Sequence, residues 1–238
     1  FRNTVGAADT GASSILAWPE DDPMAPQDAS AAAYAICKRA PIVPVLVVHD
    51  ALHARPLAEA LVAGGLPALE VTLRTDAALE VIAEMAKVEG GVVGAGTLLT
   101  PDDVKRAVDA GATFGVSPGA TDKLLQAAED LGLPMLPGAA TASEAMRLYE
   151  RGYDMLKFFP AEAAGGAPFL KSLSSPLPQV RFCPTGGVSP ANAESYLSLP
   201  NVVCAGGSWV APDNLMRKGD WAAITELARA ASTLGSRG

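Results

Sequence analysis

The sequence predicts an α/β fold, a (β/α)8 TIM barrel with an extra N-terminal helix. From about Asp28 onward, short apolar runs rich in branched residues alternate with Ala-, Leu- and Glu-rich stretches of helical periodicity. The apolar runs are continuous, which is typical of parallel strands buried on both faces. Roughly eight such units in about 200 residues suit a compact barrel. A doubly wound open sheet is the alternative, but the first run is followed by His49-Asp50-Ala51 and not by a Gly-rich dinucleotide fingerprint.

The individual elements are expected in the following order. Strands are expected at Val45–Val48, Leu69–Leu73, Val92–Gly94, Phe114–Val116, Met135–Leu136, Met155–Phe159, Val180–Cys183 and Val202–Ala205. Helices between them include Ala77–Val88, Asp102–Ala110, Asp122–Leu131 and Ser143–Tyr149. Hydroxyl residues before proline indicate helix starts at Thr100-Pro101 and Ser189-Pro190. Glycines indicate helix ends at Gly64-Gly65, Gly111, Gly132 and Gly152.

Composition limits the classes of function. Residues 28–238 are expected to form a single barrel domain, and residues 1–27 a leader or cloning-derived extension, with Met24 as a natural start. A net charge of −8 argues against a nucleic-acid partner, because such proteins need a basic surface. No apolar run approaches the roughly 20 residues that span a bilayer. Cys37, Cys183 and Cys204 fit neither a disulfide framework nor a zinc cluster, and a reducing cytoplasm is the simplest interpretation.

Two expected strands carry polar residues where a core should be apolar. Side chains alternate along a strand, so Glu70, Thr72 and Arg74 share one face, which is expected to point inward. Lys157 lies within the apolar run Met155–Phe159, where an unpaired charge would cost several kcal/mol. One interpretation is a structural Glu70–Lys157 ion pair. The other is an amine kept partly neutral so that it can attack a carbonyl and form a Schiff base.

Glycine-rich segments follow the last two expected strands. The loops after these strands form the usual phosphate site of a TIM barrel, because glycine lets backbone N–H groups approach an anion. Thr185-Gly186-Gly187 and Gly206-Gly207-Ser208 therefore predict phosphate binding, although Gly-Gly pairs also mark ordinary turns. His49 and His53 have the spacing of metal ligands on a helix, but no third ligand is evident and no metal site is expected.

Several motifs occur in one order along the chain: Leu69–Arg74, Gly94–Thr97, Ser117–Gly119, Lys157–Glu162, Arg181–Gly187 and Gly206–Trp209. Together they resemble the 2-keto-3-deoxy-6-phosphogluconate (KDPG) aldolase/4-hydroxy-2-oxoglutarate (KHG) aldolase family. The resemblance runs from about Pro44 to Trp209 and beyond. It departs at His49-Asp50, where the family often has basic residues, and in the N-terminal leader, which has no counterpart.

The resemblance implies a cytoplasmic homotrimeric lyase that needs no metal or other cofactor and cleaves a phosphorylated keto acid. It implies Lys157 as the Schiff-base residue and Glu70 as the general acid and base. The substrate-binding residues that it implies are Arg74 and Thr97 for the carboxylate, with Thr185 nearby, then Gly186, Gly187, Gly207 and Ser208 for the phosphate, and Phe159 and Pro118 as pocket walls.

Other functions remain open from the sequence. The C4 configuration of the substrate is not fixed, so a 2-keto-3-deoxy-6-phosphogalactonate aldolase is an alternative. A non-aldolase phosphate-binding barrel, such as an isomerase or a synthase of the thiamin-phosphate type, could use the same glycine loops. A sugar-phosphate-binding protein without turnover is a third hypothesis, which intact Glu70, Arg74 and Lys157 disfavour.

Overall fold

The computed structural model describes residues 23–235 of the chain. The proposed leader at residues 1–27 therefore lies mostly outside the described residues. Its last part is described: the Met24 N–H donates to the Glu129 carbonyl at 2.8 Å and the Met24 side chain is buried. Within the described range, no helix is both long and apolar enough to cross a bilayer.

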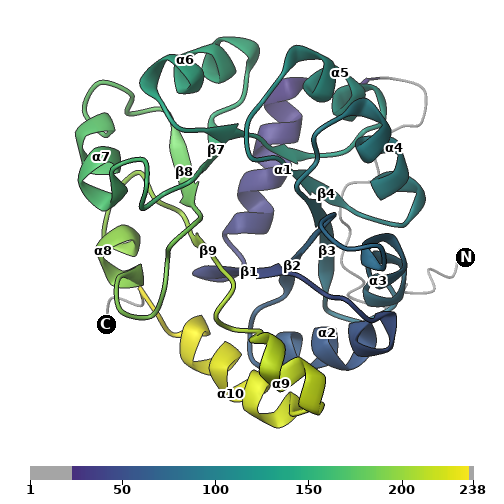
Figure 1. Ribbon diagram of the computed structural model, residues 1–238. Coiled ribbons are helices and arrows are strands. Elements are labelled where there is room, and N and C mark those ends of the chain that lie inside the picture. The colour runs from purple at the N-terminus through teal and green to yellow at the C-terminus, as the bar shows by residue number, and fades with distance from the viewer. Residues whose placement is uncertain (1–22, 236–238) are drawn as a thin grey trace, which may run out of the picture.

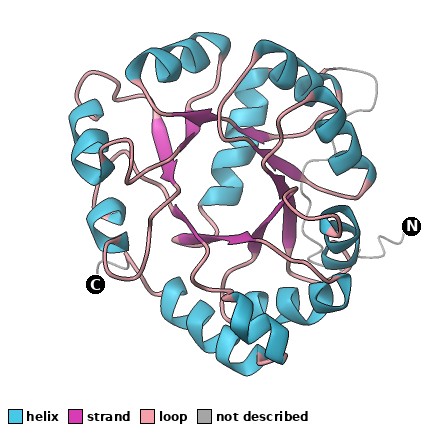
Figure 2. Ribbon diagram, viewed as in Figure 1, coloured by secondary structure: helices cyan, strands magenta, loops and turns pink. Residues whose placement is uncertain are grey.

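All paired strands are parallel and follow one another around a ring (Figure 2). They are β1 (Ile42–Leu46), β2 (Ala68–Thr72), β3 (Val92–Gly96), β4 (Phe114–Val116), β5 (Met135–Leu136), β6 (Gly138–Ala139), β7 (Met155–Phe158), β8 (Arg181–Pro184) and β9 (Ala205–Gly207). One sheet has the order β5-β4-β3-β2-β1-β9, and a second has the order β6-β7-β8. Only Pro137 separates β5 from β6, and bridges Phe182–Val202 and Thr185–Gly206 join β8 to the segment that ends in β9. The result is a curved parallel sheet, which we call the strand ring.

Helices surround the strand ring (Figure 1). They are α2 (Ala54–Ala63), α3 (Ala78–Met85), α4 (Pro101–Asp109), α5 (Asp122–Asp130), α6 (Ala142–Arg151), α7 (Gly166–Leu173), α8 (Ala193–Leu197), α9 (Asp213–Lys218) and α10 (Trp221–Ser232), with a 3-10 turn η1 at Ala51–His53. The expected start of α4 is confirmed, because Thr100 and Asp103 form a reciprocal capping box. Gly152, with φ of 116°, ends α6 as expected.

Helix α1 (Pro26–Cys37) lies across the amino end of the strand ring and is seen behind it in Figure 1. The Ser30 hydroxyl accepts the N–H groups of Asp154 and Met155 at 2.9 and 3.0 Å, at the start of β7. Ile36 and Cys37 join an apolar cluster inside the ring, which also contains Val43, Ala68, Val92, Phe114, Val116, Leu136, Met155, Cys183 and Cys204. The amino end of the ring is therefore filled by apolar side chains.

Several expected boundaries differ from the observed ones, and three of the differences have a clear physical reason. The first strand is Ile42–Leu46 and not Val45–Val48, because the Val48 carbonyl accepts the Thr75 hydroxyl at 2.6 Å instead of pairing in the sheet. The helix expected from Ser189-Pro190 begins only at Ala193, because Asn192 Oδ1 accepts the Ser189 N–H at 2.8 Å and closes a turn first. The last strand starts at Ala205, since Val202 makes only a single bridge.

Candidate active site

Lys157 on β7 and Glu70 on β2 meet inside the strand ring. Lys157 Nζ lies 3.1 Å from Glu70 Oε1, and their side chains are 7% and 3% exposed. The alternation of each strand places both side chains on the inner face, as expected, next to Ala68 and Met155 of the interior cluster. The ring of Phe159 lies 5.4 Å from the amine, so one apolar wall of the site is aromatic. An amine and a carboxylate in hydrogen-bond contact, almost without water, can exchange a proton directly.

Glycine at position 96 makes room for the carboxylate. A Cβ atom placed on Gly96 would lie 2.4 Å from Glu70 Oε1 and 2.7 Å from Glu70 Cγ. Gly96 is the register partner of Thr72 on the neighbouring strand, so the motif on β3 and the motif on β2 depend on one another. The sequence indicated Gly94–Thr97 only as a turn or a binding loop, and the structure gives Gly96 this additional role.

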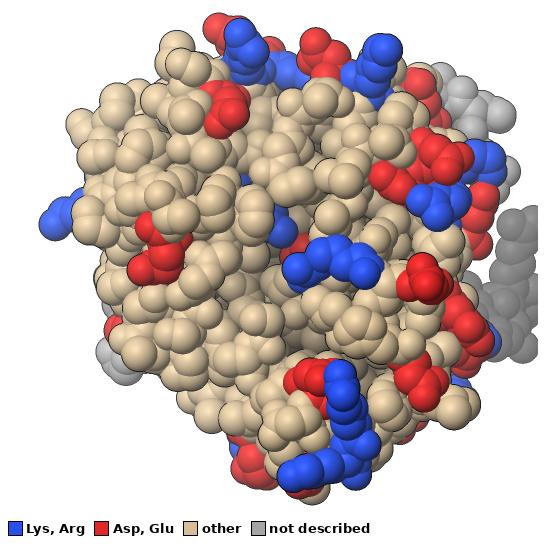
Figure 3. Space-filling view, in the orientation of Figure 1, with Lys and Arg blue, Asp and Glu red and all other residues tan. Residues whose placement is uncertain are grey.

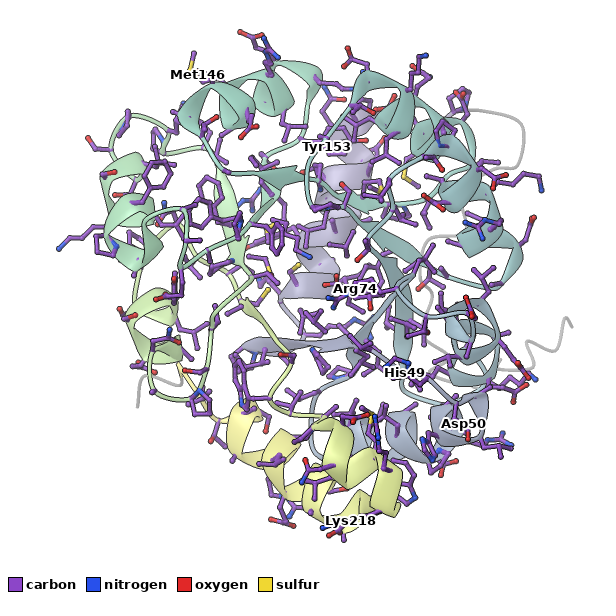
Figure 4. The ribbon with its side chains drawn as sticks, in the orientation of Figure 1. His49, Asp50, Arg74, Met146, Tyr153 and Lys218 are labelled. Carbon is purple, nitrogen blue, oxygen red and sulfur yellow. The ribbon has the colours of Figure 1, made fainter. Side chains whose placement is uncertain are left out.

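Arg74 and Thr72 have different surroundings, although both were expected on the inner face. The Thr72 hydroxyl donates to the Leu46 carbonyl at 2.8 Å and is buried, so it stabilises the contact between β2 and β1. Arg74 lies just beyond the end of β2 and is exposed, and among the described residues it has no hydrogen bond or salt bridge. Figure 4 shows Arg74 near the middle of the strand ring, with His49 and Asp50 farther out. Its guanidinium is therefore available to a bound anion.

Thr97 lies directly beyond β3, and its backbone has φ of 62°. A β-branched residue in this left-handed region is unusual and costs about 1 kcal/mol or more. The segment is held on both sides: the Leu73 N–H donates to the Gly96 carbonyl at 2.8 Å, and the Leu98 N–H donates to the Val116 carbonyl at 3.1 Å. Strain of this kind at the carboxyl end of the strands favours a functional role for Thr97.

Pro118 follows β4 at the same end of the ring. A Cβ atom on Gly138 would lie 2.3 Å from the Pro118 carbonyl carbon, so the two segments are in direct backbone contact. This contact holds Pro118 just beyond the carboxyl end of β4, against the first residue of β6.

The two glycine segments lie side by side. Thr185 and Gly206 are bridge partners, and a Cβ atom on Gly206 would lie 2.2 Å from Thr185 Oγ1. We call Thr185–Val188 the glycine loop; Gly186 and Gly187 have φ of 100° and 80°. Within residues 23–235, the N–H groups of Gly187 and Val188 donate no hydrogen bond, whereas the Gly186 N–H faces Gly206 across the bridge. These free donors can bind an anion.

Gly207 and the exposed Ser208 complete the second segment. Gly207 is buried, and a Cβ atom there would lie 2.2 Å from the ring of Trp209. This face of the molecule is mostly tan in Figure 3, with blue Lys and Arg atoms and a little red near its middle. The structure thus brings Lys157 into contact with Glu70 and Phe159, and it places the other residues expected at the site near or just beyond the carboxyl ends of their strands.

The sequence missed one feature of the interior. Cys37, Cys183 and Cys204 are all buried and belong to one cluster below Lys157, with Cys183 the register partner of Lys157. Contact with Cys183 and burial raise the pKa of the Cys204 thiol well above its ordinary value. The Cys37 thiol has its pKa raised by the same causes.

Among the described residues, no group of three or more His, Cys, Asp or Glu side chains could hold a metal ion.

Comparison with known proteins gives close matches over most of the chain. Residues 33–227 match the family model described as KDPG and KHG aldolase. The chain is 51% identical to the 2-dehydro-3-deoxy-phosphogluconate aldolase of Pseudoalteromonas atlantica, over 82% of this chain and 92% of the relative. It is 50% identical to the KHG/KDPG aldolase of Escherichia coli K12, over 84% and 94%. A crystal structure of the Legionella pneumophila KDPG aldolase, with pyruvate captured as a covalent carbinolamine intermediate, superposes with a TM-score of 0.81 at 46% identity, over 84% and 97%.

Proposed function

The chain belongs to the KDPG and KHG aldolase family, and we propose that it is the lyase that cleaves 2-keto-3-deoxy-6-phosphogluconate to pyruvate and glyceraldehyde 3-phosphate. The observation that carries this proposal is the contact between Lys157 Nζ and Glu70 Oε1 at 3.1 Å, with both side chains buried inside the strand ring. The Legionella relative, in which pyruvate was captured as a carbinolamine, supports the same amine chemistry.

The reaction needs an electron sink, because cleavage leaves an electron pair on the carbon next to the ketone. Lys157 supplies the sink when its amine attacks the ketone and water leaves, forming a protonated imine. The Lys157 proton can pass first to Glu70, since the two atoms are in hydrogen-bond contact. Glu70 then gives this proton to the carbinolamine hydroxyl, which leaves as water, so the carboxylate is a base again. Glu70, directly or through a water, then takes the proton of the substrate C4 hydroxyl, and the C3–C4 bond breaks. Glyceraldehyde 3-phosphate leaves, Glu70 returns a proton to the enamine, and water releases pyruvate from Lys157.

The remaining residues orient the substrate. Arg74 can bind the carboxylate bidentately, and the Thr97 hydroxyl lies at the end of the adjacent strand. Thr185, the first residue of the glycine loop, lies near the carboxylate-binding group, and Phe159 and Pro118 form walls. Gly186, Gly187, Gly207 and Ser208 bind the phosphate at the other side of the pocket. A substrate held at both ends presents its ketone to Lys157 in one orientation, which lowers the entropic part of the barrier.

We further propose that the strand ring is a (β/α)8 TIM barrel with α1 as the extra helix, and that residues 28–238 form one domain. A homotrimer in the cytoplasm is the assembly and location that membership of the family suggests. Cleavage of unphosphorylated 4-hydroxy-2-oxoglutarate to pyruvate and glyoxylate is a second activity, suggested by the name of the Escherichia coli relative.

Borohydride reduction in the presence of pyruvate tests the Schiff base. We expect mass spectrometry to find a stable pyruvate adduct on the peptide that contains Lys157, and to find none in Lys157→Ala. Glu70→Gln should still form the adduct but turn over about 10²- to 10⁴-fold more slowly. If folded wild-type protein forms no adduct, the Schiff-base mechanism is wrong. The alternatives would then be a phosphate-binding barrel with another chemistry, or a purely structural Glu70–Lys157 ion pair.

The substrate is tested by comparing rates on the two C4 epimers. We expect the gluconate-derived substrate to have the higher kcat/KM, and a preference for the 6-phosphogalactonate derivative would reassign the enzyme. Binding of both without turnover would favour the sugar-phosphate-binding protein.

A further inference from the structure

The carbonyl groups of Thr185, Gly186 and Gly187 accept hydrogen bonds from neighbouring segments. The Thr185 carbonyl accepts the Ala161 N–H at 2.8 Å, and the Gly186 carbonyl accepts the Glu162 N–H at 3.0 Å. The segment after β7 therefore holds the loop from one side. Because each peptide unit is planar, fixing these carbonyls also fixes the directions of the N–H groups that follow them.

Glu162 supports the next glycine through its side chain. A Cβ atom on Gly187 would lie 2.5 Å from Glu162 Cγ and 2.8 Å from Glu162 Cβ, so the loop rests directly on these methylene groups. The Gly187 carbonyl accepts the Asn192 Nδ2–H at 3.0 Å from the opposite side. The position of the Glu162 side chain thus decides where Gly187 can lie.

Tyr196 on α8 in turn holds Glu162. The tyrosine is fully buried, and its hydroxyl donates to Glu162 Oε1. Burial and the charge of Glu162 raise the pKa of Tyr196 well above its ordinary value, so the hydroxyl remains a donor at neutral pH. Gly166 at the start of α7 closes the remaining side: a Cβ atom there would lie 3.5 Å from the Tyr196 hydroxyl and 3.6 Å from Glu162 Oε1. The carboxylate is therefore confined by neighbours on two helices.

We infer that Tyr196, acting through Glu162, is a positioning residue for recognition of the substrate phosphate. The hydrogen bond keeps the Glu162 side chain under Gly187, and the glycine loop keeps its N–H groups directed at the anion. It also occupies one carboxylate oxygen that would otherwise be free to approach a negatively charged ligand. The inference rests on the proposed function, because it assumes that the glycine loop binds phosphate.

Kinetics on two substrates, one with a phosphate and one without, test the inference. In Tyr196→Phe we expect the KM for 2-keto-3-deoxy-6-phosphogluconate to rise about 10-fold, as for loss of a hydrogen bond to a charged group. The kcat, and both constants for unphosphorylated 4-hydroxy-2-oxoglutarate, should stay within about twofold of wild type. Glu162→Ala should repeat this pattern, whereas Glu162→Gln keeps an acceptor oxygen and should restore the wild-type KM.

Tyr153 offers a matched control, because its buried hydroxyl donates to Glu129 Oε1 at 3.0 Å in a second Tyr–Glu pair. Tyr153 precedes β7, at the amino end of the strand ring, away from the glycine loop. Tyr153→Phe should lower the free energy of unfolding about as much as Tyr196→Phe does, because each variant loses one buried Tyr–Glu hydrogen bond. It should leave the KM for both substrates unchanged. Two results would overturn the inference: an equal shift of KM for both substrates in Tyr196→Phe, or the same kinetics in Tyr196→Phe and Tyr153→Phe. Either would show that the Tyr196 hydrogen bond only stabilises the fold.

Calorimetry with inorganic phosphate separates this inference from the proposed function. Wild type should bind phosphate about 10-fold more tightly than Tyr196→Phe, whether or not it cleaves the sugar acid. A wild type that shows this difference without cleavage would overturn the function alone. A wild type that cleaves, with unchanged phosphate affinity and KM in Tyr196→Phe, would overturn the inference alone. A wild type that neither binds phosphate nor cleaves the sugar acid would overturn both.

Discussion

Gly96→Ala should disable the site by displacing Glu70, without removing any reacting group. The new Cβ would lie 2.4 Å from Oε1, and Cγ and Cδ are also closer than 3.0 Å. The oxygen must retreat by roughly 1 Å to reach an ordinary carbon contact of about 3.5 Å. A displacement of about 1 Å can cost on the order of 10²-fold in rate, so we expect that loss in kcat.

The same change should reduce stability only moderately. Overpacking of a filled interior costs about 1–3 kcal/mol, and each kcal/mol lowers the Tm of a domain of this size by about 2–4 °C. The assay is the initial rate of pyruvate release, measured well below the Tm of the variant, together with thermal unfolding followed by circular dichroism. Borohydride trapping on Lys157 should persist, because the amine is intact.

Gly91→Ala is the matched control, just before the same strand at its amino end. A Cβ atom there would make only ordinary contacts, the nearest at 3.4 Å from the Val88 carbonyl. We expect near wild-type rate and stability. Wild-type kcat in a folded Gly96→Ala variant would refute the view that Gly96 fixes the catalytic carboxylate.

Three further changes test other parts of the structure. Arg74→Lys loses the planar guanidinium fork and should lower kcat/KM by about 10-fold or more; normal activity would remove Arg74 from carboxylate binding. Thr97→Gly should lower kcat/KM through loss of the hydroxyl. The free energy of unfolding, measured with urea, should stay within about 1 kcal/mol of the wild-type value, because relief of backbone strain at φ of 62° offsets the flexibility of glycine. A larger loss of stability would show that the Thr97 backbone is not strained. In the capping box of α6, hydrogen bonds from the Ala140 and Thr141 N–H groups lower the pKa of Glu144. The Glu144 carboxylate contributes its full stabilisation above the ordinary glutamate pKa, and this stabilisation is lost as pH falls through the lowered pKa of the folded state. Glu144→Gln should therefore be less stable than wild type at neutral pH only. A difference in stability that persists in strong acid would contradict this account.

The catalytic pair could be predicted from the sequence because polar residues are conspicuous in buried strands. Glu70 and Lys157 each interrupt a continuous apolar run, and the period of two along a strand gives their direction. Their contact across the ring could not be predicted from either segment alone. It depends on the curvature of the sheet, which brings β2 and β7 to face one another.

Features that depend on distant pairs were missed for the same reason. Cys37, Cys183 and Cys204 are far apart along the chain and come together only where α1 meets the closed ring. The Tyr196–Glu162 contact could not be predicted from the sequence either, since Glu162 belongs to a loop before a different helix. The turn before α8 was misjudged because Asn192 competes for the Ser189 N–H, and the hydroxyl–proline pattern carries no information about that side chain.

The seal that α1 makes at the amino end of the strand ring has a kinetic consequence. In the described part of the chain, Ile36 and Cys37 pack into that end, so we expect reactants to enter and depart at the carboxyl end of the ring. In the proposed reaction, pyruvate bound covalently to Lys157 would occupy the deepest position, and the aldehyde fragment would lie between it and the exit. A dead-end passage of this shape imposes a sequence on departure: the aldehyde leaves first, and the keto acid leaves last. Run in reverse, the enzyme must load pyruvate before the aldehyde, so an aldehyde that arrives early should obstruct the passage and inhibit the condensation.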